Sequence, residues 1–189
     1  MAANIYTTEI LKDTTQKAVI KLTANFDGTG GEENQVRIQA NTLYGALATN
    51  GYLVANTQPG GIANTPLSLY NVQLTGCKYF VNFPSTTPQG SVEVFWNGSG
   101  STAAAQYANS ATIFHLNSQG EFGLGEQLPA IYNNASGGNG DIGVYTQGGS
   151  ANSAYTLIIT LRKDNGQYQR GQFNDPAAFN YGPYGLQPR

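Results

Sequence analysis

The clearest alternation of apolar and polar residues lies near the end of the chain, in residues 155–163 (YTLIITLRK). Every second residue of this run is apolar, which is the period of a pleated strand with one face toward a core. Residues 17–26 (KAVIKLTANF) alternate in the same way. We expect these two segments to pair as strands, so that the core is closed by segments near its own ends.

Between these two segments, short apolar runs are separated by glycine, proline and asparagine turns, a pattern that predicts many short strands. The expected strands are residues 35–43, 67–74, 78–83, 91–96, 111–116, 120–125, 127–132 and 142–146. Residues 103–107 allow one helical turn, and no helix of ordinary length is expected. We therefore predict an all-β fold, a single β-sandwich or jelly-roll-like domain with extended N- and C-terminal arms.

Three connections stand out in this pattern. Residues 27–33 (DGTGGEE) carry three glycines that suit tight reversals, and we expect them to form a long hairpin connection between residues 17–26 and 35–43. Asn97-Gly98 favours a tight type I′ turn. Residues 44–65 lose the alternation, which predicts a long loop or insertion.

The chain divides into three parts on this pattern. Residues 1–16 form an N-terminal arm or edge strand, residues 17–163 the β-sandwich core, and residues 164–189 an extended C-terminal arm. The last part (DNGQYQRGQFNDPAAFNYGPYGLQPR) mixes prolines, glycines and aromatic residues with no period that suits a helix or a strand. Its aromatic side chains cannot be buried within so short a segment, so we expect it to lie on a neighbouring subunit.

Charge is scarce along the whole chain. Of the 189 residues, 11% are charged, against roughly a quarter in ordinary soluble domains, and the formal net charge is -2. The absence of a basic run argues against nucleic-acid binding, and the absence of a long apolar stretch or a signal-like N-terminus against a membrane or secreted protein. A surface rich in amides and tyrosine relies little on charge repulsion, which favours contacts with protein neighbours.

Residues for catalysis or metal binding are few. Cys77 and His115 are the only cysteine and histidine. Cys77 is expected to be a buried small hydrophobe, and His115 a strand histidine rather than a member of a triad. The best carboxylate cluster, Asp27, Glu32 and Glu33, is interpreted as a solvated acidic turn. We therefore expect no catalytic residue, no metal and no cofactor.

Three segments together resemble a group of structural proteins of tailed bacteriophages, including phages of marine bacteria and cyanobacteria. They are residues 12–34 (KDTTQKAVIKLTANFDGTGGEEN), 92–98 (VEVFWNG) and 153–163 (SAYTLIITLRK). The resemblance covers about a quarter of the chain. It does not extend to the loop at residues 44–65 or to the C-terminal arm.

This resemblance implies a non-enzymatic virion protein made in the bacterial host cytoplasm. It implies a cement or decoration protein on the head surface that binds the major capsid protein and neighbouring copies of itself, as a homo-oligomer for which a trimer is the first expectation. Aromatic residues carry a large share of interface energy. The expected interface residues are Phe173, Phe179, Tyr181, Tyr184, Arg170, Lys17 and Lys21.

Two other functions stay open on the sequence. A neck or tail component of the same particle would share the fold and the self-assembly. A carbohydrate- or receptor-binding module would need exposed aromatic side chains around Trp96, although a core position for Trp96 is the preferred interpretation.

Overall fold

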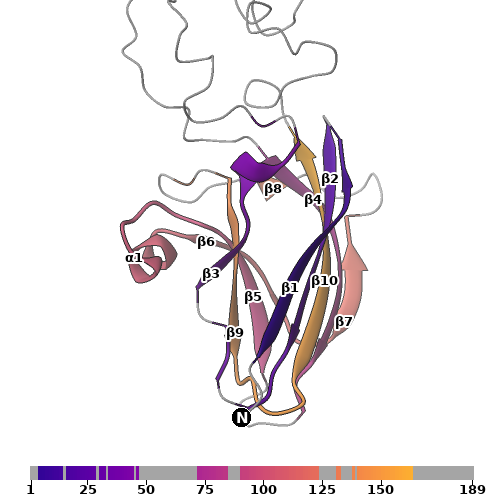
Figure 1. The fold of residues 1–189 in the computed structure, drawn as a ribbon, viewed down its shortest axis with the longest axis vertical. Coiled ribbons are helices and arrows are strands. Elements are labelled where there is room, and N and C mark those ends of the chain that lie inside the picture. The colour runs from indigo at the N-terminus through magenta and orange to yellow at the C-terminus, as the bar shows by residue number, and fades with distance from the viewer. Residues whose placement is uncertain are drawn as a thin grey trace, which may run out of the picture.

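The computed structural model describes residues 4–14, 16–28, 30–32, 34–44, 46, 72–84, 90–123, 131–132, 138 and 140–163. They form two antiparallel β-sheets with one short α-helix, which confirms the all-β, single-domain prediction (Figure 1). The strands are β1 (Ile5–Asp13), β2 (Lys17–Asn25), β3 (Gln35–Ile38), β4 (Val72–Asn82), β5 (Ser91–Trp96), β6 (Ala111–Leu116), β7 (Gln119–Phe122), β8 (Ile131–Tyr132), β9 (Ile142–Gln147) and β10 (Ala154–Lys163). The helix α1 spans Ala103–Ala108, and a 3-10 turn spans Ala40–Thr42.

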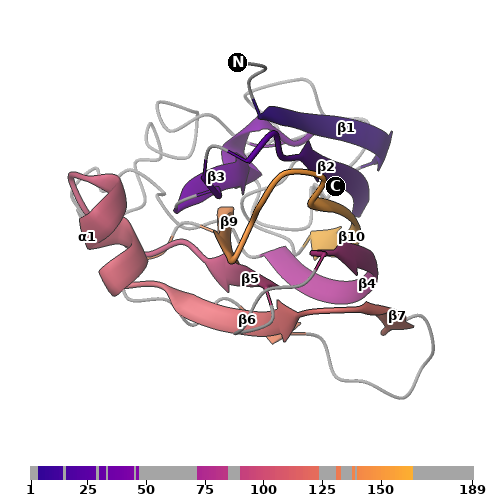
Figure 2. The ribbon, with the colours of Figure 1, turned by 90° about the horizontal axis from the view of Figure 1, so that it is seen from below.

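The strands are divided between a larger and a smaller sheet (Figure 2). The six-stranded sheet has the order β1-β2-β10-β4-β7, and β8 also pairs with β4. The four-stranded sheet has the order β3-β9-β5-β6. Because every pairing is antiparallel, neighbouring strands need no long helical crossover.

The two segments with the clearest alternation do pair, as predicted. In β10 and β2, Tyr155 faces Ala24, Leu157 faces Leu22 and Ile159 faces Ile20. All of these side chains are buried, so the alternation gave the correct core face. The two strands lie in the middle of the sheet rather than closing it, because β1 pairs with the other side of β2 and forms the edge.

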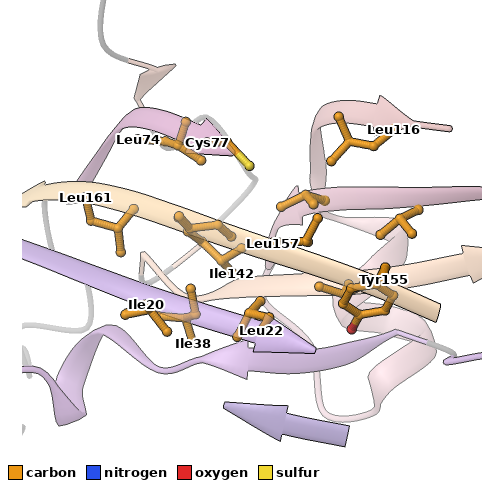
Figure 3. Packing of buried hydrophobic residues seen from close by; sticks show 14 of the residues in the cluster. Ile20, Leu22, Ile38, Leu74, Cys77, Leu116, Ile142, Tyr155, Leu157 and Leu161 are labelled. Carbon is orange, nitrogen blue, oxygen red and sulfur yellow. The ribbon is translucent and has the colours of Figure 1, made fainter. Parts of the chain in front are cut away.

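The core lies between the inner faces of the two sheets. Figure 3 shows side chains of β2 and β10, among them Ile20, Leu22 and Leu157, close to Ile38 and Ile142 of the smaller sheet. Burying a side chain of this size stabilises the fold by about 1.5–3 kcal/mol. Cys77 lies in the same cluster, which confirms its predicted role as a small buried hydrophobe.

The expected hairpin at residues 27–33 is wrong. β2 belongs to the larger sheet and β3 to the smaller one, so the connection crosses from one sheet to the other. At the crossing, the carbonyl of Glu32 accepts a hydrogen bond from the amide of Thr146 in β9 (2.9 Å), and the amide of Glu32 donates to the Thr146 hydroxyl (2.7 Å). These bonds pair the amide and the carbonyl of Glu32, which in a hairpin would be paired with the neighbouring strand.

Two further expectations are corrected. Residues 67–74 and 78–83 are not separate strands, because β4 runs unbroken from Val72 to Asn82 through Gly76, and β10 shifts register opposite that point. Residues 67–71 lie outside the described part. Asn97-Gly98 is not a tight turn: Gly98 donates to the carbonyl of Gln106, and α1 is inserted before β6.

The expected strand at residues 35–43 is shorter than predicted, because β3 ends at Ile38 and Ala40–Thr42 forms a 3-10 turn. Most of the other elements agree with the sequence pattern. β5, β6, β7 and β9 fall on expected strands, and β1 is the expected edge strand. The expected single helical turn is α1, capped by the hydroxyl of Thr102, which accepts from the amide of Ala105. In the described residues, no helix is long and apolar enough to cross a membrane.

Candidate assembly site

A buried lysine lies at the end of the central strand. Lys163, the last residue of β10, is almost fully buried, and its ammonium donates to the Asp13 carboxylate and to the carbonyls of Thr14 and Tyr44, both at 2.8 Å. Asp13 also accepts from the amide of Tyr44 at 2.7 Å. Burial lowers the pKa of Lys163, and the hydrogen bond and charge of Asp13 oppose that shift. Three acceptors therefore compensate the loss of water around the ammonium.

The Lys163 cluster lies close in sequence to two long stretches of the chain. Lys163 immediately precedes residues 164–189, and its register partner Val72 immediately follows residues 47–71. Tyr44, whose carbonyl Lys163 binds, lies just before that second stretch. Figure 1 shows the start of β4 and the end of β10 at the same end of the sandwich. The Lys163 cluster thus holds together, at one end of the sandwich, described residues that are close in sequence to both stretches.

A second buried ionic cluster lies at the other end of β10. The Glu32 carboxylate accepts from the hydroxyl of Tyr155 and forms an ion pair with Arg37, with 3.1 Å between the closest atoms. The Arg37 guanidinium also donates to the carbonyl of Thr7 (2.8 Å) and lies 5.4 Å from the centre of the Tyr6 ring. The carboxylate therefore joins the crossing segment to β3 and β10, and Arg37 connects β1 to the same cluster.

The environment of Glu32 differs from the predicted solvated acidic turn. The side chain is buried, and burial raises its pKa, opposed by Tyr155 and Arg37. Burial, together with the charge of Glu32, raises the pKa of Tyr155 far above its usual value. Asp27 is half-buried, and Glu33 lies outside the described residues. The part of the chain that the structure describes contains no group of three or more acidic, histidine or cysteine side chains placed for a metal.

A buried carboxylate, Glu93, lies opposite the histidine His115 on neighbouring strands of the smaller sheet. Glu93 accepts from the hydroxyls of Tyr107 (2.7 Å) and Thr112, which fastens α1 to the outer face of the smaller sheet. Burial and Glu93 raise the pKa of Tyr107 to about 12. His115 is the register partner of Glu93, and its side chain is exposed. With both oxygens of Glu93 hydrogen-bonded, this carboxylate is placed to hold α1 rather than to orient His115.

Trp96 and Cys77 lie inside the sandwich. Trp96 is fully buried, so its ring cannot stack on a sugar, and the preferred interpretation of a core residue is confirmed. Burial raises the pKa of the Cys77 thiol to about 12, so the thiolate form that reacts is scarce at neutral pH.

The outer face of the larger sheet carries a row of charged residues. One row across it runs through register partners on five strands: Glu9, Lys21, Ile158, Lys78 and Glu121. The two lysines form exposed ion pairs with the acids at the ends of the row, at 3.4 Å and 3.0 Å. The face is therefore charged but locally neutral, which lowers the cost of covering it with another protein.

The predicted interface residues fall into two groups. Lys17 and Lys21 both lie on β2; Lys17 is exposed, and Lys21 is a member of the charged row. The other five predicted residues belong to the C-terminal arm and lie outside the described residues, so the structure does not bring them into a site. They are Arg170, Phe173, Phe179, Tyr181 and Tyr184. Sequence reasoning missed Asp13 and Lys163 and named Glu32 only as a solvated acid, because Asp13 binds Lys163, and Glu32 binds Tyr155, more than a hundred residues away along the chain.

Comparison of the chain with protein-family models, with curated proteins and with solved structures finds no match.

Proposed function

We propose that this protein is a structural component of a tailed-bacteriophage virion, a cement or decoration protein that binds the major capsid protein on the head surface. Its partners are capsid subunits and neighbouring copies of itself, in a homo-oligomer for which we propose a trimer. Two features support the proposal: the resemblance of three segments to phage structural proteins and the low charge of the chain.

One observation carries this proposal. The C-terminal segment continues directly from β10, which lies in the middle of the larger sheet and pairs along its length with both β2 and β4. A pull on that segment is therefore resisted by two full ladders of backbone hydrogen bonds and by the buried Lys163. A cement protein needs such an attachment, because the segment that grips its neighbour must not detach from the core.

On this proposal the mechanism is additive burial. The sandwich rests on capsid subunits, the C-terminal aromatic residues bind neighbouring chains, and repeated interfaces of about 1,200–2,000 Å² each resist expansion of the shell. Phe173, Phe179, Tyr181 and Tyr184 are the proposed anchors. Arg170, Lys17 and Lys21 contribute charged contacts around them.

The test uses the full chain and shells assembled from the capsid protein. Replacing the four aromatic anchors with alanine should weaken binding at least a hundredfold, since one hot-spot truncation costs about 2 kcal/mol or more. The matched control replaces Gln167, Gln169, Gln172 and Asn180 with alanine in the same segment and should bind nearly as well as the wild type. Equal binding by wild type and anchor variant would refute the role of the aromatic residues, and failure of the wild type to bind any shell would refute the proposed function.

A further inference from the structure

The edge strand β1 carries an unusual set of exposed apolar side chains. Ile5, Ile10 and Leu11 are 60%, 53% and 48% exposed, and nearly every other residue of the strand is exposed as well. β1 pairs with β2 along one edge, and no described strand pairs with its other edge. In Figure 2, β1 lies at the rim of the molecule, beyond β2. Among the described strands the backbone on that edge therefore has no ladder partner, although the Thr7 carbonyl accepts a hydrogen bond from the Arg37 side chain.

Natural proteins usually protect such an edge. They shorten the strand, place proline or inward-pointing charges in it, or cover it. β1 is nine residues long, contains no proline, and directs Tyr6, Thr8 and Ile10 to the inner side, because their partners on β2 face the core. Its inward-pointing charge, Asp13, is the last residue of the strand and is bound by Lys163. Its one irregularity is a bulge between Ile10 and Lys12, near its end. An edge of this kind is suited to adding a strand.

The sequence of β1 is complementary to itself in one antiparallel register. When two copies pair about a two-fold axis, facing residues lie on the same side of the sheet. With the axis at Thr8, Ile10 faces Tyr6 of the second copy, Glu9 faces Thr7, and Leu11 lies beside Ile5. Apolar residues then meet apolar residues on both faces of the new sheet, and no acid faces an apolar or acidic residue.

The neighbouring registers are worse. Placing the axis at Thr7 sets Glu9 against Ile5, and placing it at Glu9 sets that carboxylate against its own copy. Placing the axis at Ile10 sets Glu9 against Leu11. Like charges that face each other across strands are destabilising, and an acid against an apolar residue loses solvation without a partner.

We propose that β1 is a dimerisation strand, which pairs antiparallel with β1 of a second copy about an axis at Thr8 and joins the two larger sheets into one. The contact is isologous and closes after two chains, so it is independent of any three-fold contact elsewhere on the molecule. It also does not depend on a place in a virion. A contact formed mainly by one strand is small, so the dimer should dissociate in the micromolar range.

Sedimentation of the full-length protein, from micromolar to millimolar concentration, tests the dimer. The wild type should shift from monomer to dimer across this series, and Ile10→Lys should stay monomeric. The matched control is Phe80→Lys, since Phe80 is 51% exposed on the outer face of the same sheet but away from β1, and it should dimerise like the wild type. Circular dichroism establishes that each variant is folded. A wild type that is monomeric throughout, or a dimer that Ile10→Lys leaves intact, overturns the proposal.

Disulfide trapping tests the register. Cysteine in place of Thr8 faces its own copy across the axis and should form a covalent dimer under mild oxidation. Cysteine in place of Glu9 is offset by two residues, so the two Cα atoms lie about 8 Å apart, beyond the roughly 7 Å limit for a disulfide. The native Cys77 is buried and does not compete. Equal cross-linking at both positions overturns the proposed pairing.

Discussion

Lys163 and Glu32 show how single residues fix the two ends of this sandwich. Both are buried charged groups, and both bind partners far away in sequence: Lys163 is 150 residues from Asp13, and Tyr155 is 123 residues from Glu32. Each bond joins segments that only the folded chain brings together. Both residues are therefore expected to matter for stability and for holding the ends of the strands in place.

Removing the buried ammonium should be costly. Lys163→Met leaves the Asp13 carboxylate and the carbonyls of Thr14 and Tyr44 without their donor, so we expect a loss of about 3 kcal/mol in the free energy of unfolding. The control is Lys78→Met, whose ion pair with Glu121 is more than half exposed on both sides and should contribute less than about 1 kcal/mol. Urea unfolding measures both. Equal losses in the two variants would contradict a special role for Lys163.

Glu32 should make stability depend on pH. Because its pKa in the folded protein is raised above the ordinary 4.5, the folded state holds a proton that the unfolded state has already lost. Unfolding then releases a proton, so the contribution of Glu32 to stability is complete below 4.5 and declines as the pH rises through the folded pKa.

Urea unfolding of the wild type and of Glu32→Gln across this pH range measures that contribution. The stability difference between the two proteins should shift in favour of Glu32→Gln as the pH rises. A difference that does not change with pH would show that the pKa of Glu32 is not raised.

At the scale of the elements, β10 organises the larger sheet because two strands pair with it along nearly its whole length. Its alternation separates core residues from residues of the outer face. Ile159 is fully buried, whereas its neighbour Ile158 lies on the outer face in the charged row and is half-buried. Adjacent residues of the same type therefore have different environments.

This difference predicts unequal effects of the same substitution. Ile159→Ala should destabilise the protein by about 2–5 kcal/mol, since it leaves a cavity between the sheets, and Ile158→Ala by about 1 kcal/mol or less. Thermal and urea unfolding of the two variants provide the comparison. Similar losses would mean that the outer face of β10 is covered as closely as the inner face.

Alternation predicted β2 and β10 because the period of a half-buried strand is local information, and short apolar runs between turn residues predicted β5 and β9. It did not predict that residues 27–33 cross between sheets, because a hairpin and a crossing need the same glycine-rich turn residues. The Glu32 cluster escaped detection for a related reason. An acidic residue beside glycines is usually solvated, and only the folded chain places Arg37 and Tyr155 against it.

At the scale of the whole molecule, the two ends and the edge of the sandwich have separate parts in this account. The Lys163 end anchors the C-terminal segment, the Glu32 end joins the two sheets, and β1 presents an edge for a second copy. The outer face of the larger sheet presents charges that are already paired with each other. Such a division of roles suits a protein whose work is assembly.

The most direct test of the proposed cement function is a cryo-electron-microscopy map of the virions that contain this protein. The account predicts two-sheet cores on the outside of the head, with density continuing from the Lys163 end of each core onto a neighbouring subunit. Cores found only at the neck or tail, or heads without them, would contradict it.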